Sequence, residues 1–116
     1  MEDEFKIDVY KIMGTSTPAG RTSEDGEPAG DTIKSLILEN WDKYEKLSIY
    51  CEGVVQMTRP FVDEAFAKVL ETHSLDEFNQ KLHFSDSNDR TVKSLNDAIK
   101  LRLKIIKIQK EREQQA

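Results

Sequence analysis

The sequence predicts a small single-domain α/β fold in which short strands alternate with helices. Three observations predict it: a period-two apolar pattern near the N-terminus, a short apolar run around residue 50, and several segments with apolar residues at helical spacing. A chain of 116 residues is long enough for one hydrophobic core and too short for two. We therefore expect residues 1–116 to form one domain.

The first strand is predicted from the segment FKIDVYKI. Phe5, Ile7 and Val9 alternate with charged residues, as in a half-buried strand. The apolar residues then change phase, so we expect a bulge or the end of the strand at residues 10–12. Residues 14–31 follow, with four of the five glycines and two of the three prolines of the chain, and are expected to form a long loop, open or pinched into a short hairpin.

Two central elements come next. A helix is predicted over residues 32–47, with Asp31 or Thr32 as its N-cap and this apolar face: Ile33, Leu36, Ile37, Trp41 and Tyr44. The run LSIYCEGVV is expected to be a central strand that is covered on both faces.

The second half of the chain is predicted to be mostly helical. A helix near residues 61–70 carries a strongly patterned apolar face, made of Val62, Ala65, Phe66, Val69 and Leu70. Ser74 and Glu77 form a capping-box pattern that opens a short helix with Leu75 and Phe78 inward. The segment KLHFS is expected to be a brief strand, and SDSND caps a long C-terminal helix over residues 88–112. We expect a mixed sheet of about four strands covered by these helices.

Composition and charge narrow the class of function. The net charge is −5, but residues 1–89 hold 9 lysines and arginines against 19 acids, whereas residues 90–116 hold 8 against 3. An acidic protein with one basic helix argues against a general nucleic-acid binder. No apolar run reaches the roughly 20 residues that span a bilayer. The lone Cys51 is expected to be a core residue of a cytoplasmic protein.

The junction MTRP precedes the helix at residues 61–70. Thr58 is favoured as the N-cap, with Pro60 in the first turn and Asp63 and Glu64 complementing the helix dipole. Two alternatives remain open: Thr58 and Arg59 contact a partner, or Thr58 is a phosphoacceptor.

Three short motifs resemble, in order, those of the bacterial STAS-like domains, a largely uncharacterised family related in fold to the anti-sigma-factor antagonists. They are PAGR at residues 18–21, AGD at 29–31 and FVDEAF at 61–66. The resemblance spans roughly residues 5–103. It implies a STAS-like fold and a protein partner, plausibly an ATPase of the histidine-kinase type. In the antagonists such a kinase phosphorylates a serine at this helix start; here Pro60 and Ala29 replace the serines usual in the STAS-like family.

Other candidate chemistry is weak. Arg21 could cradle an anion, or it could pair internally with its acidic neighbours, which are Glu24, Asp25, Glu27 and Asp31. His73 and His83 lack metal-ligand spacing. Asp63 and Glu64 are adjacent and point to different faces of a helix, which suits paired carboxylate catalysis poorly. We therefore expect no enzyme, no metal and no cofactor.

The C-terminal helix carries two apolar stripes, Val92, Leu95, Ile99 and Ile106 on one side, and Ala98, Leu101, Ile105 and Ile108 on another. One stripe can cover the sheet, whereas the second needs another cover. We favour a second copy of the chain or a partner protein on Leu101, Ile105 and Ile108 over complete internal burial. A membrane-bound basic helix is disfavoured, because large aromatic residues are absent.

These observations predict a non-catalytic bacterial regulatory or interaction module. Its partner surface is expected at Thr58, Arg59 and the Gly-rich loop, with Gly20, Arg21 and Gly30. The alternative is a small-ligand, nucleotide or anion sensor that uses Arg21 and the two helix N-termini.

Overall fold

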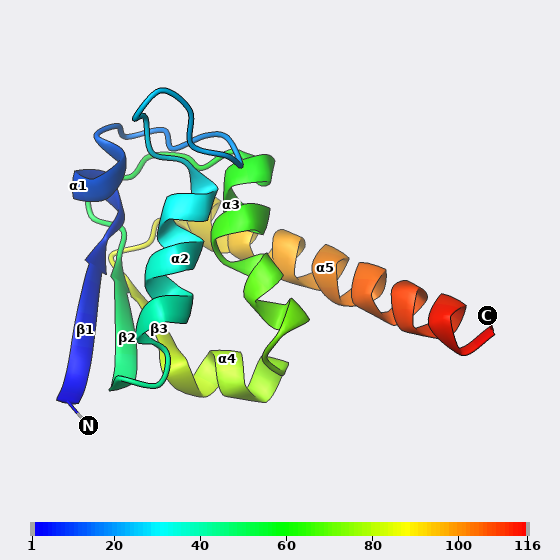
Figure 1. The fold of residues 1–116 in the computed structure, drawn as a ribbon. Coiled ribbons are helices and arrows are strands. Elements are labelled where there is room, and N and C mark those ends of the chain that lie inside the picture. The colour runs from blue at the N-terminus through cyan, green and yellow to red at the C-terminus, as the bar shows by residue number, and fades with distance from the viewer. Residues whose placement is uncertain (1, 116) are drawn as a thin grey trace.

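The structure is a computed structural model that describes residues 2–115. Its elements, in chain order, are β1 (Glu2–Asp8), α1 (Val9–Met13), α2 (Gly30–Asn40), β2 (Tyr44–Tyr50), α3 (Arg59–Ala65), the 3-10 helix η1 (Ala67–Glu71), α4 (Leu75–Lys81), β3 (Leu82–Ser85) and α5 (Asp89–Gln115). Figure 1 shows them as one body from which the end of α5 projects.

The sheet of the described residues has three strands in the order β1-β2-β3, and all of them are parallel. The prediction of a mixed sheet of about four strands is therefore wrong in both respects. Each connection between strands passes through helices, which return the chain to the same end of the sheet and make neighbouring strands parallel. The loop between α1 and α2 adds only one antiparallel bridge, between Glu24 and Glu27, so it is pinched into a hairpin without joining the sheet.

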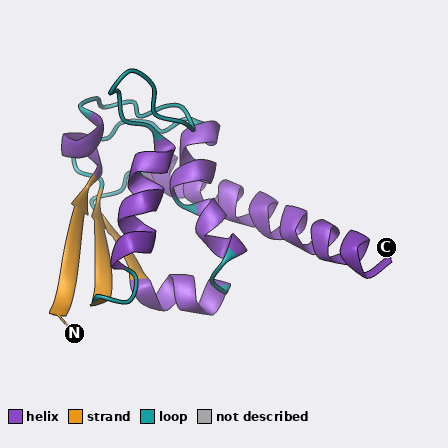
Figure 2. Cartoon of the chain, in the orientation of Figure 1, coloured by secondary structure: helices purple, strands orange, loops and turns teal. Residues whose placement is uncertain are grey.

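The long helices cover only one face of the sheet (Figures 1 and 2). The register sets Ile7, Ile49 and Phe84 side by side toward the helices, while the adjacent row brings Lys6 and His83 to an exposed polar face. Ser48 of the central strand lies in that second row and is only 5% exposed, so β2 is buried on both faces at its centre, as predicted, although no long helix lies on the second face. The apolar run extends beyond β2. From Cys51 onward it is a turn leading to α3, in which Cys51 and Val54 are buried and Val55 is 51% exposed.

The N-terminal helix α1 was not predicted. Val9 begins α1 instead of extending the strand, and the carboxylate of Asp8 caps it by accepting the Lys11 N–H at 3.1 Å. Gly14 ends α1 with a φ of +68°, a left-handed conformation that glycine adopts without strain. The expected end of the strand near residue 10 is confirmed, and its cause is this cap.

Helix α2 is shorter than predicted and begins earlier. Its N-cap is Ala29, which has no side-chain hydrogen-bonding group, and the Thr32 hydroxyl accepts the Ala29 N–H at 3.2 Å. The prediction of Asp31 or Thr32 as N-cap is wrong by two residues or more. The helix ends at Asn40 because Tyr44 already belongs to β2, where its ring packs against Phe5 with centroids 5.0 Å apart.

The predicted core face of the third helix is confirmed. All five of its apolar residues are buried, although the helix changes to 3-10 geometry after Ala65. The capping box is also confirmed, since the Glu77 N–H donates to Ser74 Oγ at 3.1 Å and the Ser74 N–H donates to Glu77 Oε1 at 2.8 Å. Phe78 is buried as expected, but Leu75 is 37% exposed, so its predicted inward position is wrong.

The long C-terminal helix is confirmed as α5. Asn88 is its N-cap, because Asn88 Oδ1 accepts the Thr91 N–H at 2.8 Å. The first half of α5 packs against α3 and η1, whereas the second half extends away from the body (Figure 1). Within α5 and the other helices of residues 2–115, no span combines the length and apolarity needed to cross a membrane.

Candidate functional site: the groove between α3 and α5

The Gly-rich loop is ordered, and it packs against the segment that leads into α3. The Ser16 carbonyl accepts the Val55 N–H at 2.8 Å, and the Pro18 carbonyl accepts the Thr58 N–H at 3.1 Å. Pro18 itself is fully buried. The loop therefore fixes the start of α3 in place.

Thr58 is the N-cap of α3, as predicted. Its Oγ1 accepts the Phe61 N–H at 3.4 Å, and Arg59 and Pro60 occupy the first turn. The first turn holds no acidic residue, because Asp63 and Glu64 lie one turn further on. Their carboxylates are held by cations from other segments, so the predicted role of complementing the dipole gives way to ion pairing.

The start of α2 is closed by the loop. The N–H groups of Gly30 and Asp31 donate to the carbonyls of Gly20 and Arg21, at 3.0 and 2.9 Å. Gly30 is buried, and a Cβ there would lie 2.8 Å from Glu64 Cβ and 2.9 Å from the Phe61 carbonyl oxygen. Gly30 therefore lies at the contact between α2 and α3, where its lack of a side chain lets the two helices approach closely.

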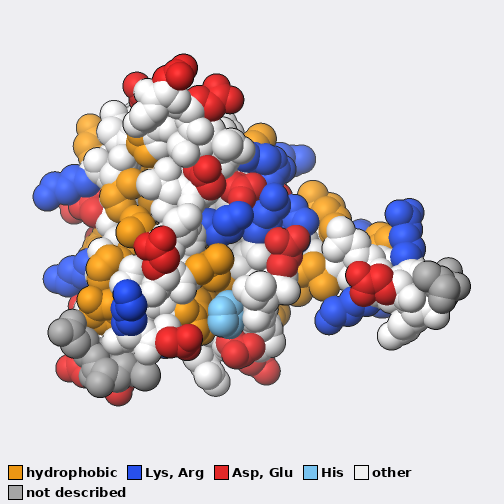
Figure 3. All heavy atoms as spheres, in the orientation of Figure 1, with side chains coloured by type: hydrophobic (Ala, Val, Ile, Leu, Met, Phe, Trp, Pro, Cys, Tyr) orange, Lys and Arg blue, Asp and Glu red, His pale blue; other side chains and the backbone are white. Residues whose placement is uncertain are grey.

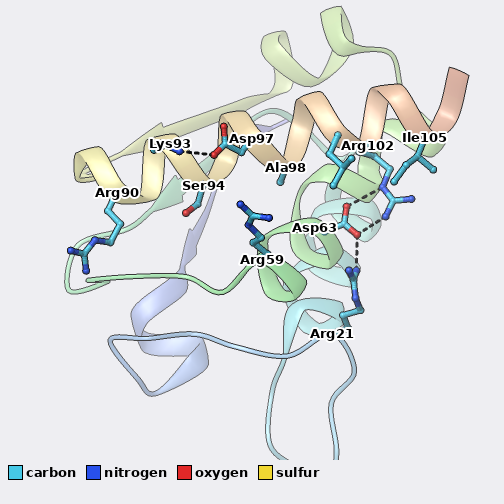
Figure 4. Close-up of a pocket in the computed structure, with 11 residues that line it drawn as sticks. Arg21, Arg59, Asp63, Arg90, Lys93, Ser94, Asp97, Ala98, Arg102 and Ile105 are labelled. Carbon is cyan, nitrogen blue, oxygen red and sulfur yellow. Dashed lines mark hydrogen bonds and ion pairs between the residues drawn. The ribbon is translucent and has the colours of Figure 1, made fainter. Parts of the chain in front are cut away.

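Arg21 makes an internal ion pair, but not with the acidic neighbours that the sequence offered. Its guanidinium donates to Asp63 Oδ2 at 2.6 Å and lies 3.8 Å from Glu64 Oε1. Asp63 also accepts two hydrogen bonds from Arg102 of α5, one of them from Nε at 2.9 Å. A single carboxylate therefore joins the loop, α3 and α5 (Figure 4).

The electrostatics of this cluster favour the charged forms. Burial opposes ionisation of Asp63, but the hydrogen bonds from Arg102 and Arg21 outweigh it and hold the pKa of Asp63 below its ordinary value. Glu64 is only 6% exposed, and hydrogen bonds from Lys34 and Lys68 likewise overcome the effect of burial and lower its pKa. Neither carboxylate has the raised pKa that a general acid needs at neutral pH.

A groove of about 470 Å³ lies between this cluster and α5. Five cations line it, namely Arg21, Arg59, Arg90, Lys93 and Arg102, together with the carboxylates of Asp63 and Asp97. Ala98, Leu101 and Ile105 form its apolar wall. In Figure 4 the Arg59 side chain extends from the start of α3 toward α5, between Asp97 and Asp63.

The charges in the groove are not balanced. Asp63 is used by Arg21 and Arg102, and Asp97 by Lys93 at 3.0 Å. Arg59 is exposed and makes no ion pair or hydrogen bond with any residue in the range 2–115. Arg90 reaches only the neutral Gln56, at 3.2 Å. Neither guanidinium group has a carboxylate of residues 2–115 within ion-pair distance, although Arg59, after Lys93 and Lys100, contributes to lowering the pKa of Asp97.

The second apolar stripe of α5 is not covered by the fold. Leu101 is 56% exposed and Ile108 is 44% exposed, while Ile105 is half-buried. Complete internal burial of α5, which the sequence analysis disfavoured, does not occur. Over residues 89–114 of α5, for which the structure describes burial, only Thr91 and Leu95 are buried.

Several groove residues were missed by the sequence analysis. Arg90, Ser94 and Asp97 were not singled out, although they share a helix face with Leu101 at spacings of three and four residues. Arg102 was not singled out either, and its side chain is only 11% exposed because it pairs with Asp63. The spacing on α5 was available in the sequence, whereas the pairing was not.

The remaining candidate residues lie elsewhere. His73 stacks on Trp41 with ring centroids 3.8 Å apart, and His83 contacts the Gln80 carbonyl. Cys51 is buried, and burial raises the pKa of its thiol. Among residues 2–115, no three His, Cys, Asp or Glu side chains come together as a metal site requires.

Comparison of the sequence with known protein families found a match. The family described as "STAS-like domain of unknown function (DUF4325)" matches residues 30–92, more than half of the chain. The chain belongs to this family. The match runs from the start of α2 to the first turn of α5, so this STAS-like domain has its Gly-rich loop and most of α5 outside the matched range. No curated protein and no solved structure matched the chain.

Proposed function

We propose that this STAS-like domain is a non-catalytic regulatory module that docks a partner protein in the groove between α3 and α5. The observation that carries the proposal is the unpaired Arg59, which lies at the start of α3 beside an exposed apolar stripe. Arginine flanked by apolar surface is typical of the residues that dominate protein interfaces. The ordered Gly-rich loop supports this surface by fixing Thr58 and Arg21.

The proposed kind of partner rests on the resemblance seen in the sequence, because the matched family is described as one of unknown function. The resemblance to bacterial STAS-like domains makes a histidine-kinase-type ATPase the first candidate. Thr58 stands at the helix start where the related antagonists carry a phosphoacceptor, but its hydroxyl is already engaged in capping α3. We therefore assign Thr58 to positioning Arg59 and leave phosphorylation as the lesser proposal. The buried Cys51 fits a cytoplasmic setting.

A non-catalytic role is supported by the state of the reactive groups. The carboxylate of Asp63 is held by two cations and that of Glu64 by three, and the thiol of Cys51 is enclosed in the core. No nucleophile with an adjacent base emerges from these contacts. Steady turnover of a substrate that is lost on changing Thr58 would contradict this assignment.

The exposed stripe on α5 has a competing assignment, which is a homodimer through Leu101, Ile105 and Ile108. Light scattering coupled to size exclusion distinguishes the two. A dimer that dissociates in a Leu101→Asp variant would favour self-association, and a monomer would leave the stripe to a partner.

A small anionic ligand is the second candidate, because the volume of the groove lies within the usual range for small-molecule sites. The hydrogen-bond donors that the sequence suggested for an anion already have partners within the protein. Arg21 pairs with Asp63, and the first N–H groups of α2 donate to carbonyls of the loop. A ligand would have to bind Arg59 and Arg90 instead. Thermal denaturation with inorganic phosphate and with nucleotides tests this, because a tight ligand must raise the melting temperature.

The docking proposal is tested by capture from lysate of the source cells. Wild-type protein, Arg59→Asp and the matched control Lys11→Asp, an exposed cation in α1, are compared by mass spectrometry. We expect one stoichiometric protein with wild type and with the control, and its loss with Arg59→Asp. Equal capture of the same protein by wild type and by Arg59→Asp would contradict docking in the groove. Failure of wild type to capture any protein reproducibly would favour the ligand candidate.

A further inference from the structure

The exposed part of α5 has an unusual composition for a protein that is acidic elsewhere. Residues 98–110 contain five lysines and arginines and no aspartate or glutamate. Apart from Arg102, whose side chain is 11% exposed, these cations are exposed. This stretch is therefore a basic surface with apolar residues set into it.

The apolar residues follow the spacing of a helix-pairing seam. Ala98, Leu101, Ile105 and Ile108 are separated by three, four and three residues, the intervals that a helix uses to pack against another helix. Ala98, Leu101 and Ile105 already form one wall of the groove. The groove and the seam are thus one continuous surface that runs along α5.

Not all the cations beside this seam have internal partners. Asp63 is already shared by two arginines, and Asp97 is paired with Lys93. Arg59 and Arg90 have no carboxylate partner among residues 2–115. Toward the C-terminus, Lys100 and Lys104 continue the positive charge on the exposed side. A complementary ligand must therefore bring its own carboxylates along with apolar side chains.

We propose that the ligand is an acidic amphipathic α-helix of a partner protein, which lies along α5 in the groove. Its apolar residues pack on Leu101, Ile105 and Ile108, and its carboxylates pair with Arg59 and Arg90. This inference rests on the proposed docking function and deepens it by stating the chemistry of the partner. In Figure 3 the Lys and Arg side chains gather between the body and the projecting part of α5, and acidic side chains cluster at the loop tip.

A second copy of the chain is a poorer occupant of this surface. Two copies of α5 paired through the seam would bring two cationic segments together, with no acid between residues 98 and 110 of either helix. An anionic membrane is also a poorer occupant, because no aromatic residue lies in α5 to anchor it in the headgroup region.

The proposal is tested with two labelled peptides of about 21 residues, each three heptads long with leucine at the a and d positions. One peptide carries glutamate at the e and g positions, and the other carries lysine there. Fluorescence anisotropy measures binding to the full chain, and circular dichroism measures the helix gained on mixing. We expect saturable binding and added helix with the acidic peptide only, weakened at least tenfold when salt rises from about 50 to about 500 mM.

Two pairs of variants locate the site. Arg59→Glu and Leu101→Asp are each expected to weaken binding of the acidic peptide at least tenfold. Their controls are Lys11→Glu, in α1, and Val92→Asp, which changes an exposed apolar residue of α5 on a different side of the helix. The controls are expected to bind within about twofold of wild type. Circular dichroism of each variant confirms that it is folded before its affinity is compared.

Five outcomes would overturn the inference, and the first four concern binding. These four are equal binding of both peptides, no binding of the acidic peptide, binding that Arg59→Glu and Leu101→Asp leave unchanged, and tighter binding to phosphatidylserine vesicles than to the peptide. A stable dimer of the free chain that disappears in Leu101→Asp would also overturn it. If the peptide fails but the lysate partner is still lost with Arg59→Asp, docking stands and only the acidic helix is excluded.

Discussion

At the scale of single residues, Asp63 holds the candidate site together. Its carboxylate accepts hydrogen bonds from Arg21 in the loop and from Arg102 in α5, and it belongs to α3 itself. Its side chain is 14% exposed, so water screens these interactions only in part. The relative position of the three segments that line the groove therefore depends on one side chain.

We expect Asp63→Asn to lower the free energy of unfolding by about 1–3 kcal/mol, because the amide keeps one oxygen acceptor, replaces the other with an NH2 donor and removes the negative charge that Arg21 and Arg102 share. Urea denaturation measures the change. Asp42→Asn, at an exposed position in the turn between α2 and β2, is the control and should change stability by less than about 0.5 kcal/mol. Equal stability of Asp63→Asn and wild type would show that the cluster contributes nothing.

The same cluster predicts a dependence of stability on pH. The pKa values of Asp63 and Glu64 lie below their ordinary values, so the folded state binds fewer protons than the unfolded state in the acid range. Their contribution is fully present above about pH 5 and is lost as pH falls below about 4. Denaturation at a series of pH values should show a shallower acid loss in Asp63→Asn than in wild type. An equal loss of stability with falling pH in wild type and Asp63→Asn would show that the ionised Asp63 does not stabilise the fold.

Local interactions at this scale were predictable, and distant ones were not. Thr58 is a cap whose partner lies three residues away, so the order Thr-Arg-Pro is enough to predict it. Arg21 was correctly considered for an internal ion pair, but its partner Asp63 lies 42 residues along the chain. Four nearer acids were equally plausible by sequence, and only the packing of the loop on α3 decides among them.

At the scale of elements, the close approach of α2 and α3 depends on Gly30. A Cβ at this position would lie 2.8 Å from Glu64 Cβ and 2.9 Å from the backbone oxygen of Phe61. Neither atom is the end of a flexible side chain, so the two helices would have to separate.

We therefore expect Gly30→Ala to lower stability by about 1–3 kcal/mol, even though alanine favours helix formation over glycine. The matched control is Ser35→Ala, an exposed position in the same helix, which should be neutral or slightly stabilising. Thermal and urea denaturation of both variants provide the comparison. A Gly30→Ala variant as stable as wild type would mean that the helices can move apart without cost.

Helix α5 divides into a packed half and a projecting half. All residues from Lys107 to Gln114 are exposed, so a chain that ends at Ile108 should unfold within about 0.5 kcal/mol of the full chain. A chain that ends at Ala98 loses Arg102 and should be destabilised by more than about 1 kcal/mol. Equal stability of the two truncated chains in urea would contradict the packing of α5 on α3.

Elements were predictable where periodicity and caps agreed. The capping box at Ser74, the start of α5 and the buried face of α3 all follow from residues within one or two turns. The boundary between α2 and β2 was misplaced, because Tyr44 fits a helical face as well as it fits the start of β2, where it pairs with Glu2 and its ring packs on Phe5. The choice between the two depends on strand pairing, which joins residues about 40 positions apart.

At the scale of the whole molecule, charge and apolar surface are unevenly distributed. The acidic residues belong mainly to residues 1–89, while the basic helix forms one side of the groove. The sequence was sufficient to predict a STAS-like α/β domain and an uncovered helix stripe. It could not predict the groove, because its walls come from the loop, α3 and α5, which only the fold brings together.

The most direct test of partner docking is crosslinking inside the source cells from a photoreactive side chain placed at Ser94, which lies in the groove. The same side chain at Lys11, in α1 away from the groove, is the control. We expect one discrete crosslinked protein from position 94 and none from position 11, with the product lost when Arg59→Asp is added. No crosslink at position 94, or the same products from both positions, would contradict the groove as the docking surface.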